Sequence, residues 1–487
     1  MLFNTPIFVV FFTLVCTFYW LLRERRQQNL LLLATSYVFY GMWSWKFLLL
    51  LAVSTAIDYW CAMRIESSAR QQQKRFWLLL SLISNLGVLI TFKYLGFFLQ
   101  ETVAIFETLG FRVGSVPVFE VLLPVGISFY TFQSMGYVVD VYRRKIAATH
   151  DLHEYALYVA FFPQLVAGPI ERAGHMLPQF RHDRQWNVAA FESGLLLMAW
   201  GLFKKVVIAD NLAPYVDLVF LQPDVYSGST VLAAVVFFAF QIYCDFSGYT
   251  DIARGVARTM GFELVRNFDY PYISRTPVEF WRRWHISLSQ WFQDYLYFPM
   301  AMRYMRLGGW ASKYKAHIVA MGLIGFWHGA NWTFIMFGLY WGLIIALYLY
   351  AVESMNERRL IGKWRLPAPL RILLTTSAMF ALVCIGWILF RAESLPAAWQ
   401  IMMRIFSWTA GKAVLRPNIM DASVLWVMIA GLLLVEWGHR RSYPLRHWIA
   451  KSAGVGYVLR AGLLAVILCS YLSAQQGVTL PFIYFQF

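Results

Sequence analysis

The stretch Ile318–Tyr350, with the sequence IVAMGLIGFWHGANWTFIMFGLYWGLIIALYLY, decides the class of fold. It contains no aspartate, glutamate, lysine or arginine, and its single histidine is His328. A straight helix crosses the apolar core of a bilayer in about 20 residues, so this stretch is long enough to span a membrane. An ionisable side chain in hydrocarbon is costly and is therefore a candidate for function. The stretch thus predicts membrane-spanning structure with a functional histidine inside it.

Apolar runs of similar character recur along the whole chain. Of the 487 residues, 59% are hydrophobic and 14% are charged, whereas a soluble domain carries roughly 25% charged residues. Several runs are shorter than a full span, so we expect some segments to be tilted, broken or re-entrant. The sequence predicts an all-α, polytopic membrane protein with about ten to twelve spanning or re-entrant helices.

The net charge of +16 arises from short basic loops between the apolar runs. Lysine and arginine gather on the cytoplasmic side of membrane proteins, so these loops indicate topology and not nucleic-acid binding. The first run, Pro6–Leu22, has an uncharged start before it and Arg23-Glu24-Arg25-Arg26 after it. This order places the N-terminus outside. The run lacks the basic start and the cleavage site of a signal peptide, so we expect it to remain as a span.

No polar stretch is long enough to form a soluble domain, so we interpret residues 1–487 as a single membrane domain. Residues 1–120 resemble plain peripheral spans, and residues 351–487 return to plain spans that include Val458–Tyr471. Residues 121–350 mix apolar runs with proline, glycine and charged residues. We expect this middle zone to hold the catalytic core.

Two apolar segments of the middle zone contain helix-breaking residues. They are Leu123–Tyr130, with a proline and a glycine, and Phe161–Pro169, with two prolines and a glycine. Irregular backbone at membrane depth is tolerated where it is buried in protein or lines a watery cavity. We therefore expect a hollow core with re-entrant segments, and the alternative is a pair of kinked spans in a packed bundle.

The surroundings of His328 suit proton transfer. Imidazole has an unperturbed pKa close to working pH, which favours it as a general base. Gly325 and Gly329 form a pair of small residues that lets another helix approach closely. Asn331 lies one turn after His328 and is a candidate to hold its ring or a substrate, and Trp327 is a candidate wall of the site. The alternative is a hydrogen-bonded histidine that only packs.

A second histidine lies in an aromatic and basic segment that opens with Thr276-Pro277-Val278-Glu279. This pattern is typical of a capping box with proline at the first helical position, so a helix is predicted to begin here. An apolar stripe follows at helical spacing, and His285 borders it. Arg282 and Arg283 lie on the other side, within reach of Glu279. By itself, His285 is more readily explained as a structural residue than as a catalyst.

Two carboxylates follow an apolar run in the segment YCDFSGYTD, which covers residues 243–251. Asp245 and Asp251 are therefore predicted at or near the membrane boundary. An ion pair between Asp251 and Arg254, one turn apart, is the structural interpretation. The functional one is that both carboxylates orient the cavity wall or the acceptor. The two histidines are distant in sequence and have no evident third ligand, and the five cysteines form no CxxC pair, so no metal site is predicted.

Taken together, these residues resemble the membrane-bound O-acyltransferase superfamily, in the bacterial branch that acetylates alginate and transfers D-alanine to teichoic acids. The likeness runs over most of the chain and is strongest from 120 to 345. The matching stretches are Asn29–Tyr40 with Trp43, Leu123–Tyr130, Phe162–Pro169, Cys244–Asp251, Asn267–Ser274, Glu279–Ser289 and Phe326–Asn331.

The resemblance implies several properties that the residues alone do not give. It implies helices around a central tunnel through the bilayer, with His328 as the essential histidine and His285 facing the same tunnel. It implies acetyl-CoA or another acyl thioester as donor substrate, with no bound cofactor. The acetyl group would pass to an extracytoplasmic polysaccharide such as alginate, helped by a periplasmic or membrane-anchored acetyltransferase partner. Residence among the lipids of the bacterial inner membrane follows from the same likeness.

Other functions remain open from the sequence. D-Alanyl transfer to teichoic acid is an alternative within the same superfamily. A transporter or flippase of a polysaccharide precursor also fits broken helices with buried polar groups, but no related halves stand out in the hydropathy pattern. A non-catalytic scaffold for a polysaccharide complex would leave His328 and the capped aromatic helix without a purpose.

Overall fold

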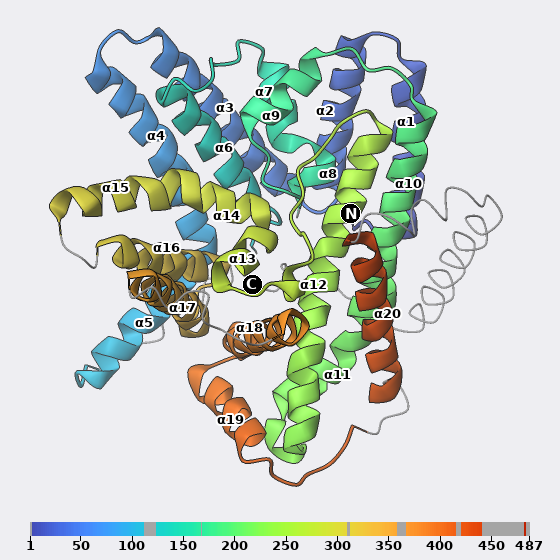
Figure 1. The fold of residues 1–487 in the computed structure, drawn as a ribbon. Coiled ribbons are helices and arrows are strands. Elements are labelled where there is room, and N and C mark those ends of the chain that lie inside the picture. The colour runs from blue at the N-terminus through green and yellow to red at the C-terminus, as the bar shows by residue number, and fades with distance from the viewer. Residues whose placement is uncertain are drawn as a thin grey trace. The chain divides into compact units, whose positions relative to one another are not determined.

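The computed structural model describes residues 2–111, 123–166, 168–308, 312–357, 367–414, 420–440 and 482–483. Within these ranges the secondary structure is helical (Figure 1), apart from an isolated bridge between Tyr226 and Lys412. The predicted all-α class is thereby confirmed. The chain divides into two compact units, Met1–Met198 with Ile252–Val265, and Ala199–Asp251 with Arg266–Phe487.

The first unit contains the amino-terminal helices and short pieces from later in the chain. Its segments are α1 (Pro6–Leu21), α2 (Arg25–Gly41), α3 (Trp45–Ser67), α4 (Gln71–Leu89), the π-helix η1 (Ile90–Tyr94), α5 (Leu95–Thr108), α6 (Ile127–Tyr142), α7 (Leu152–Ala160), α8 (Phe162–Leu165), α9 (Ala173–Arg181) and most of α10 (Val188–Leu202).

The two predicted helix breaks both occur, and they contact each other inside this unit. Gly126 has a φ of 76°, and α6 begins directly after it. A Cβ on Gly126 would lie 2.4 Å from the carbonyl oxygen of Leu165, so only glycine allows both this conformation and this approach. Phe162 donates its backbone N–H to Ser36 Oγ at 3.1 Å. The two broken segments are therefore packed against protein at this contact. This packing agrees here with the second expectation, a pair of kinked spans in a packed bundle.

The second unit holds both candidate histidines. Its segments are the end of α10, the π-helix η2 (Phe203–Ala209), α11 (Asp210–Leu221), η3 (Pro223–Val225), most of α12 (Gly228–Thr259), η4 (Pro271–Ile273), α13 (Pro277–Arg283), α14 (Ile286–Phe292), the π-helix η5 (Gln293–Tyr297), α15 (Phe298–Leu307), α16 (Ser312–His328), α17 (Trp332–Glu357), α18 (Ala368–Arg391), α19 (Leu395–Phe406) and α20 (Ala422–Arg440).

The stretch Ile318–Tyr350 forms two helices, α16 and α17, which turn at residues 329–331. Their backbones approach closely at small residues. A Cβ on Gly325 would lie 2.2 Å from the carbonyl oxygen of Phe334, and one on Gly338 would lie 2.3 Å from that of Met321. The predicted role of Gly325 in close helix packing is confirmed. Gly329 lies in the turn, against the ring of Phe334.

Five helices among the described residues are long and apolar enough to cross a membrane: Trp45–Ser67, Gln71–Thr108, Gly228–Thr259, Trp332–Met355 and Ala368–Arg391. Pro6–Leu21 and Ala422–Gly438 are shorter apolar helices. The predicted run Val458–Tyr471 lies outside the described residues. The protein is therefore a multi-pass membrane protein, while the total of ten to twelve segments and the central tunnel stay predictions.

Candidate functional site

His328 is the last residue of α16, and its side chain is buried, with 5% of the residue exposed. Aromatic rings surround it. The centroid of its ring lies 5.1 Å from that of Phe390 and 6.0 Å from that of Phe337, both in edge-on arrangements. The side chains of Phe390 and Phe337 thus form apolar walls beside the imidazole.

His285 lies between α13 and α14, where its backbone takes the left-handed conformation with φ 43° and ψ 57°. The stripe of aromatic residues had predicted one continuous helix through this point, and that prediction is wrong. The last helical bond of α13 runs from Trp284 N–H to Phe280 O at 2.8 Å, and the first of α14 runs from Ser289 N–H to His285 O at 3.0 Å. The helix is interrupted between them, where Ile286 N–H bonds to Asn267 O at 2.9 Å and not to a carbonyl of α13. His285 is 1% exposed, and burial lowers the pKa of its imidazole to about 3.

The two histidines share one neighbour, Trp327. The ring centroid of Trp327 lies 6.3 Å from that of His285, nearly parallel to it, and 4.9 Å from that of His328. The other face of the site is Phe246 of α12, 4.6 Å from the His285 ring. The fold thus brings two histidines that are 43 positions apart in the sequence to one indole ring. A contact of Trp327 with substrate stays a prediction.

Arg283, the last residue of α13, is paired with carboxylates at the start of this segment. The guanidinium of Arg283 donates to Glu279 Oε1 at 3.2 Å and to Asp269 Oδ2 at 3.1 Å, so it fastens α13 to the loop before it. Thr276 Oγ1 accepts from Glu279 N–H at 3.1 Å, and the helix begins at Pro277, which confirms the predicted start.

Arg282 is exposed and lines a cavity of about 440 Å³ within the second unit. The cavity lies among α13, α14, η5, α16 and α17, and its walls are mostly apolar. Along α16 it is lined by His317, Met321 and Ile324, and Ile324 is one helical turn before His328. Residues four apart lie on one helix face, so the lined face of α16 continues to His328.

Asn331 stands in the turn before α17 and uses its amide to shape that turn. Its Oδ1 accepts from Thr333 N–H at 3.0 Å, and its Nδ2 donates to Glu393 O at 3.1 Å. These bonds are those of a helix-capping residue. A contact of Asn331 with substrate stays a prediction.

Asp245 is buried on α12 and forms part of an ion-pair cluster. Its Oδ1 lies 2.6 Å from Lys205 Nζ, which also lies 2.8 Å from Asp210 Oδ1. Its Oδ2 accepts the backbone N–H of Ile483 at 2.7 Å. The structure therefore gives this carboxylate a role in holding α12, η2 and the segment at 482–483 together.

Asp251 lies further along α12, next to a second buried lysine. Its Oδ2 is 2.6 Å from Lys204 Nζ, and the same ammonium group donates to Ser247 Oγ at 3.0 Å. Both lysines belong to the π-helix η2, and π-helical turns occur frequently at functional sites. The neighbouring side chains of Lys204 and Lys205 thus reach two different carboxylates of one helix.

A role for these two lysines was not predicted from the sequence. They follow the apolar run that ends at Phe203, and two consecutive lysines flanked by apolar residues were a signal that paired carboxylates had to exist elsewhere. Nor was a role predicted for the Asn267 side chain, which is fully buried and bonds to Ser287, two residues after His285. No helical or strand spacing predicts this hydrogen bond, because it joins two residues that are 20 positions apart across an irregular loop.

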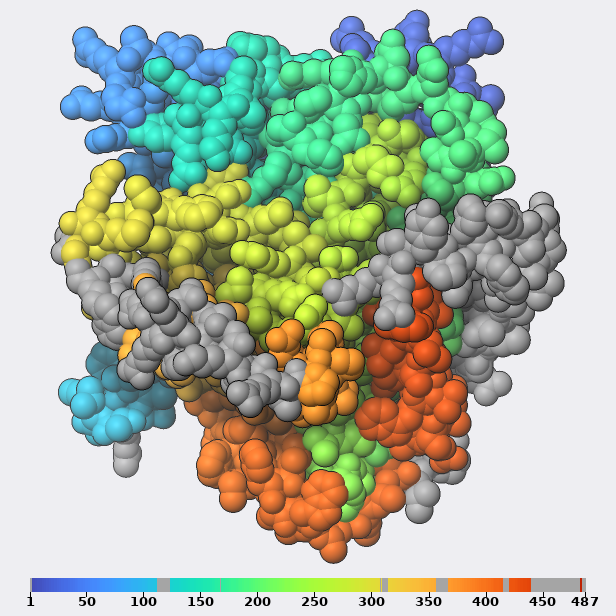
Figure 2. Space-filling model, viewed as in Figure 1, coloured from blue at the N-terminus to red at the C-terminus, as the bar shows by residue number. Residues whose placement is uncertain are grey.

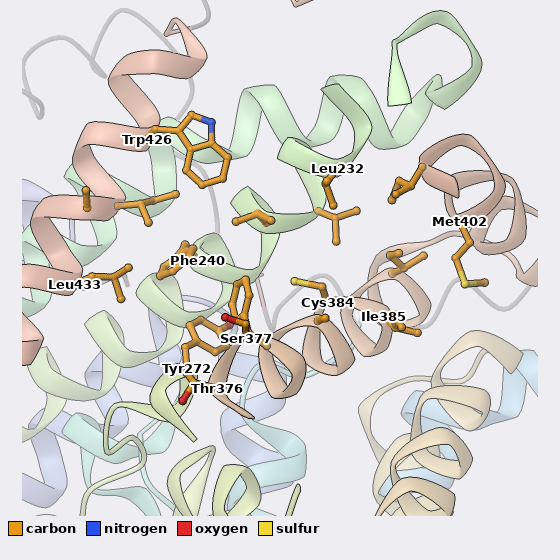
Figure 3. A pocket seen from close by; sticks show the side chains of 18 of the residues that line it. Leu232, Phe240, Tyr272, Thr376, Ser377, Cys384, Ile385, Met402, Trp426 and Leu433 are labelled. Carbon is orange, nitrogen blue, oxygen red and sulfur yellow. The ribbon is translucent and has the colours of Figure 1, made fainter. Parts of the chain in front are cut away.

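A second cavity of about 630 Å³ lies among α12, α18, α19 and α20 (Figure 3). Its lining is almost wholly apolar, and Tyr272 forms part of the wall. The ring of Tyr272 stacks on Trp284 at a centroid distance of 5.9 Å, and Trp284 directly precedes His285. Tyr272 therefore connects the wall of this cavity to the residue before His285.

A model of the membrane-bound O-acyltransferase family matches residues 30–390, which include both histidines. The chain belongs to this family. It is 36% identical to the probable alginate O-acetylase of Azotobacter vinelandii over the full length of both chains. It is 38% identical to the corresponding protein of Pseudomonas aeruginosa, over 93% of this chain and 85% of that one. The peptidoglycan O-acetyltransferase of Helicobacter pylori is 35% identical over 82% of this chain and 79% of its own.

Membership of the membrane-bound O-acyltransferase family makes the protein an O-acyltransferase of the membrane. Teichoic acid D-alanyltransferases are more distant relatives. Among the described residues, no group of three or more histidine, cysteine, aspartate or glutamate side chains is arranged to hold a metal ion.

Proposed function

We propose that this O-acyltransferase moves an acetyl group from a cytoplasmic thioester, acetyl-CoA, to an extracytoplasmic polysaccharide. The observation that carries the proposal is the burial of two imidazoles, His328 and His285, which both lie against the ring of Trp327. The full-length relatives whose names specify alginate O-acetylation support an acetyl group and a sugar polymer.

In the proposed reaction, His328 acts as general base. Its neutral imidazole takes the proton of the accepting hydroxyl while the hydroxyl oxygen attacks the thioester carbonyl. The carbon–sulfur bond then breaks, and the proton passes from the imidazolium to the leaving thiolate. Such proton transfer is worth roughly 10²–10⁴-fold in rate. His285, held neutral by burial, orients the donor or shares the proton.

The cavity beside Arg282 supports a route for the donor. A guanidinium at its edge attracts the phosphates of coenzyme A, because arginine binds phosphate strongly. The apolar walls suit the less charged arm of the thioester, and the lined face of α16 leads toward His328. Arg283 contributes less directly, since its charge is already paired with Glu279 and Asp269.

Further features complete the proposal. The protein resides in the bacterial inner membrane with its N-terminus outside, as the basic residues after the first span indicate. A periplasmic or membrane-anchored acetyltransferase partner receives the acetyl group and passes it to the polymer. Alginate is the acceptor that the names of the full-length relatives favour, and peptidoglycan is the alternative that the Helicobacter relative suggests.

The proposal is tested by replacing His328 with alanine in cells that make the polymer. We expect the acetyl content of the polymer, measured by mass spectrometry, to fall to background, because no other group would take the hydroxyl proton. His182→Ala is the matched control, since His182 is exposed in a loop of the first unit. Normal acetylation by His328→Ala at normal protein abundance would end the catalytic assignment.

Transport of an intact precursor is separated from catalysis by labelled acetyl-CoA. Purified protein in vesicles should release free coenzyme A as label passes to an acceptor or to water. Movement of an intact solute without cleavage of the thioester would favour a transporter. Comparing the substituents of the surface polymers with and without the gene then identifies the acceptor and distinguishes acetyl from D-alanyl groups.

A further inference from the structure

The turn at His285 needs support from outside its own helices. His285 is a non-glycine residue with φ 43°, a conformation that is disfavoured by its Cβ and persists only where the surroundings hold it. α13 and α14 are each only seven residues long, so they supply few bonds of their own here. Some neighbouring group must therefore fix the chain between them.

Asn267 meets this need. Its carbonyl oxygen accepts the N–H of Ile286 at 2.9 Å. Its Oδ1 accepts both the N–H of Ser287 at 3.3 Å and the Oγ–H of Ser287 at 2.6 Å. Three bonds from one residue thus hold the two positions that follow His285.

The same side chain reaches the helix that packs on the His285 ring. Asn267 Nδ2 donates to Thr250 Oγ1 of α12 at 3.4 Å. Thr250 is one turn after Phe246, whose ring centroid lies 4.6 Å from that of His285. Asn267 is fully buried, so water does not compete for these bonds. Its amide therefore links the turn that carries His285 to the wall that the imidazole faces.

We propose that Asn267 is a positioning residue for acyl transfer: it fixes the turn after His285 and so holds the imidazole between Phe246 and Trp327. The inference rests on the proposed function for its effect on transfer. Its effect on the placement of His285 is independent of that function. The two consequences are measured separately.

The test replaces Asn267 with alanine, which removes its side-chain bonds and keeps the backbone bond to Ile286. We expect acetyl transfer to fall about tenfold through lost orientation of His285. We also expect His285, inert in the parent protein because it is buried, to become reactive toward diethyl pyrocarbonate. Mass spectrometry of the modified peptide reads this out without any catalytic activity.

Two further variants grade the effect. Ser287→Ala removes the 2.6 Å bond and keeps the N–H bond, so it should change both readouts in the same direction by less. Thr250→Val removes the 3.4 Å bond and should change them least. Ser287→Ala also carries the test if Asn267→Ala does not fold.

Controls separate positioning from general loosening of the protein. His150, whose side chain is 69% exposed, should react equally in every variant and serves as the internal reference. Asn29→Ala is the matched control, since Asn29 is a buried amide of the first unit that bonds to Phe180 O and to Arg184. It should leave His285 unreactive.

Increased reactivity of His285 in Asn267→Ala, with the melting temperature close to that of the Asn29 control, supports the proposal. Unchanged reactivity of His285, or a loss of transfer fully matched by lower protein abundance, overturns it. If His285→Ala itself transfers acetyl groups normally, the catalytic role of His285 fails, whereas the labelling still shows whether Asn267 holds this residue.

Discussion

At the scale of single residues, His285 combines a strained backbone with a buried ring. Left-handed conformations of non-glycine residues cost roughly 1–3 kcal/mol and gather at functional sites. The contacts with Phe246 and Trp327 and the bonds from Asn267 to the following residues offset this cost. The strained backbone therefore supports the proposed role of the imidazole at this place.

Replacing His285 with asparagine should separate function from stability. Asparagine tolerates the left-handed conformation better than most residues, so we expect the free energy of unfolding to change by no more than about 1–2 kcal/mol. Acetyl transfer should fall by roughly 10²-fold or more, because the imidazole is gone. Thermal melting in detergent and acetylation by purified protein measure the two effects. Full activity of His285→Asn would reduce His285 to a packing residue.

At the scale of elements, α12 is fastened to η2 by two buried lysines. Removing one partner of a buried ion pair leaves an uncompensated charge, which costs about 3–5 kcal/mol. The pairs of Lys204 with Asp251 and of Lys205 with Asp245 each join the two segments at 2.6 Å. Phe246 follows Asp245 directly, so the ion pairs also fix the wall of the histidine site.

We expect Lys205→Met to lower the melting temperature sharply, because Asp245 and Asp210 would both lose their cation. Lys205→Arg, which keeps the charge, should lower it less. Lys145→Met is the control: Lys145 is half-exposed and 3.8 Å from Asp140, and surface pairs contribute about 0–1 kcal/mol. Equal melting temperatures for Lys205→Met and Lys145→Met would show that the cluster does not stabilise the fold.

The close packing of α16 on α17 gives a second prediction at this scale. Gly338→Ala places a Cβ 2.3 Å from Met321 O, so the helices must separate and His328 must shift. We expect lower stability and lower transfer. Gly431→Ala in α20 meets nothing within 4 Å, and alanine favours helix over glycine by about 1 kcal/mol, so it should be neutral or stabilising. The same sign for both changes in thermal melting would contradict the packing argument.

At the scale of the whole molecule, the apolar spans and the basic loops determine how the chain enters the membrane. Figure 2 shows α15 at the surface of the molecule, where Phe298, Met302 and Met305 are each about half exposed. With Arg303 and Arg306 on the same helix, α15 is typical of a segment that lies in the membrane interface. A helix of this kind lies along the interface and does not cross the bilayer.

The orientation of the chain can be tested with new cysteines. Asn4→Cys, before the first span, should react with a membrane-impermeant maleimide added to intact spheroplasts. Gln72→Cys, in the first turn of α4 close to Arg70, Lys74 and Arg75, should react only after the membrane is opened. The parent protein gives the background labelling of its own five cysteines, of which the four that the structure describes, Cys16, Cys61, Cys244 and Cys384, are buried. The reverse labelling pattern would place the N-terminus in the cytoplasm.

Much of the molecule follows from local sequence, because apolar length, capping residues and helix breakers act within a few positions. Long apolar runs determined the helical membrane class, Thr276 and Pro277 the start of α13, and Gly126 the break before α6. His328 stood out because an ionisable group in an apolar run is costly wherever the chain folds.

Only the tertiary structure decided which distant groups meet. The helical pattern continues through His285, but the helix breaks there. At the break, Asn267 forms hydrogen bonds to Ser287 that a continuous helix would not allow. The pairing of Lys204 and Lys205 with carboxylates of α12 depends on how a π-helical turn aims neighbouring side chains. Trp327 joins the two histidines because α16 brings its ring to His285, 42 residues earlier in the chain. Contacts of this kind depend on packing between segments, and no spacing within one segment encodes them.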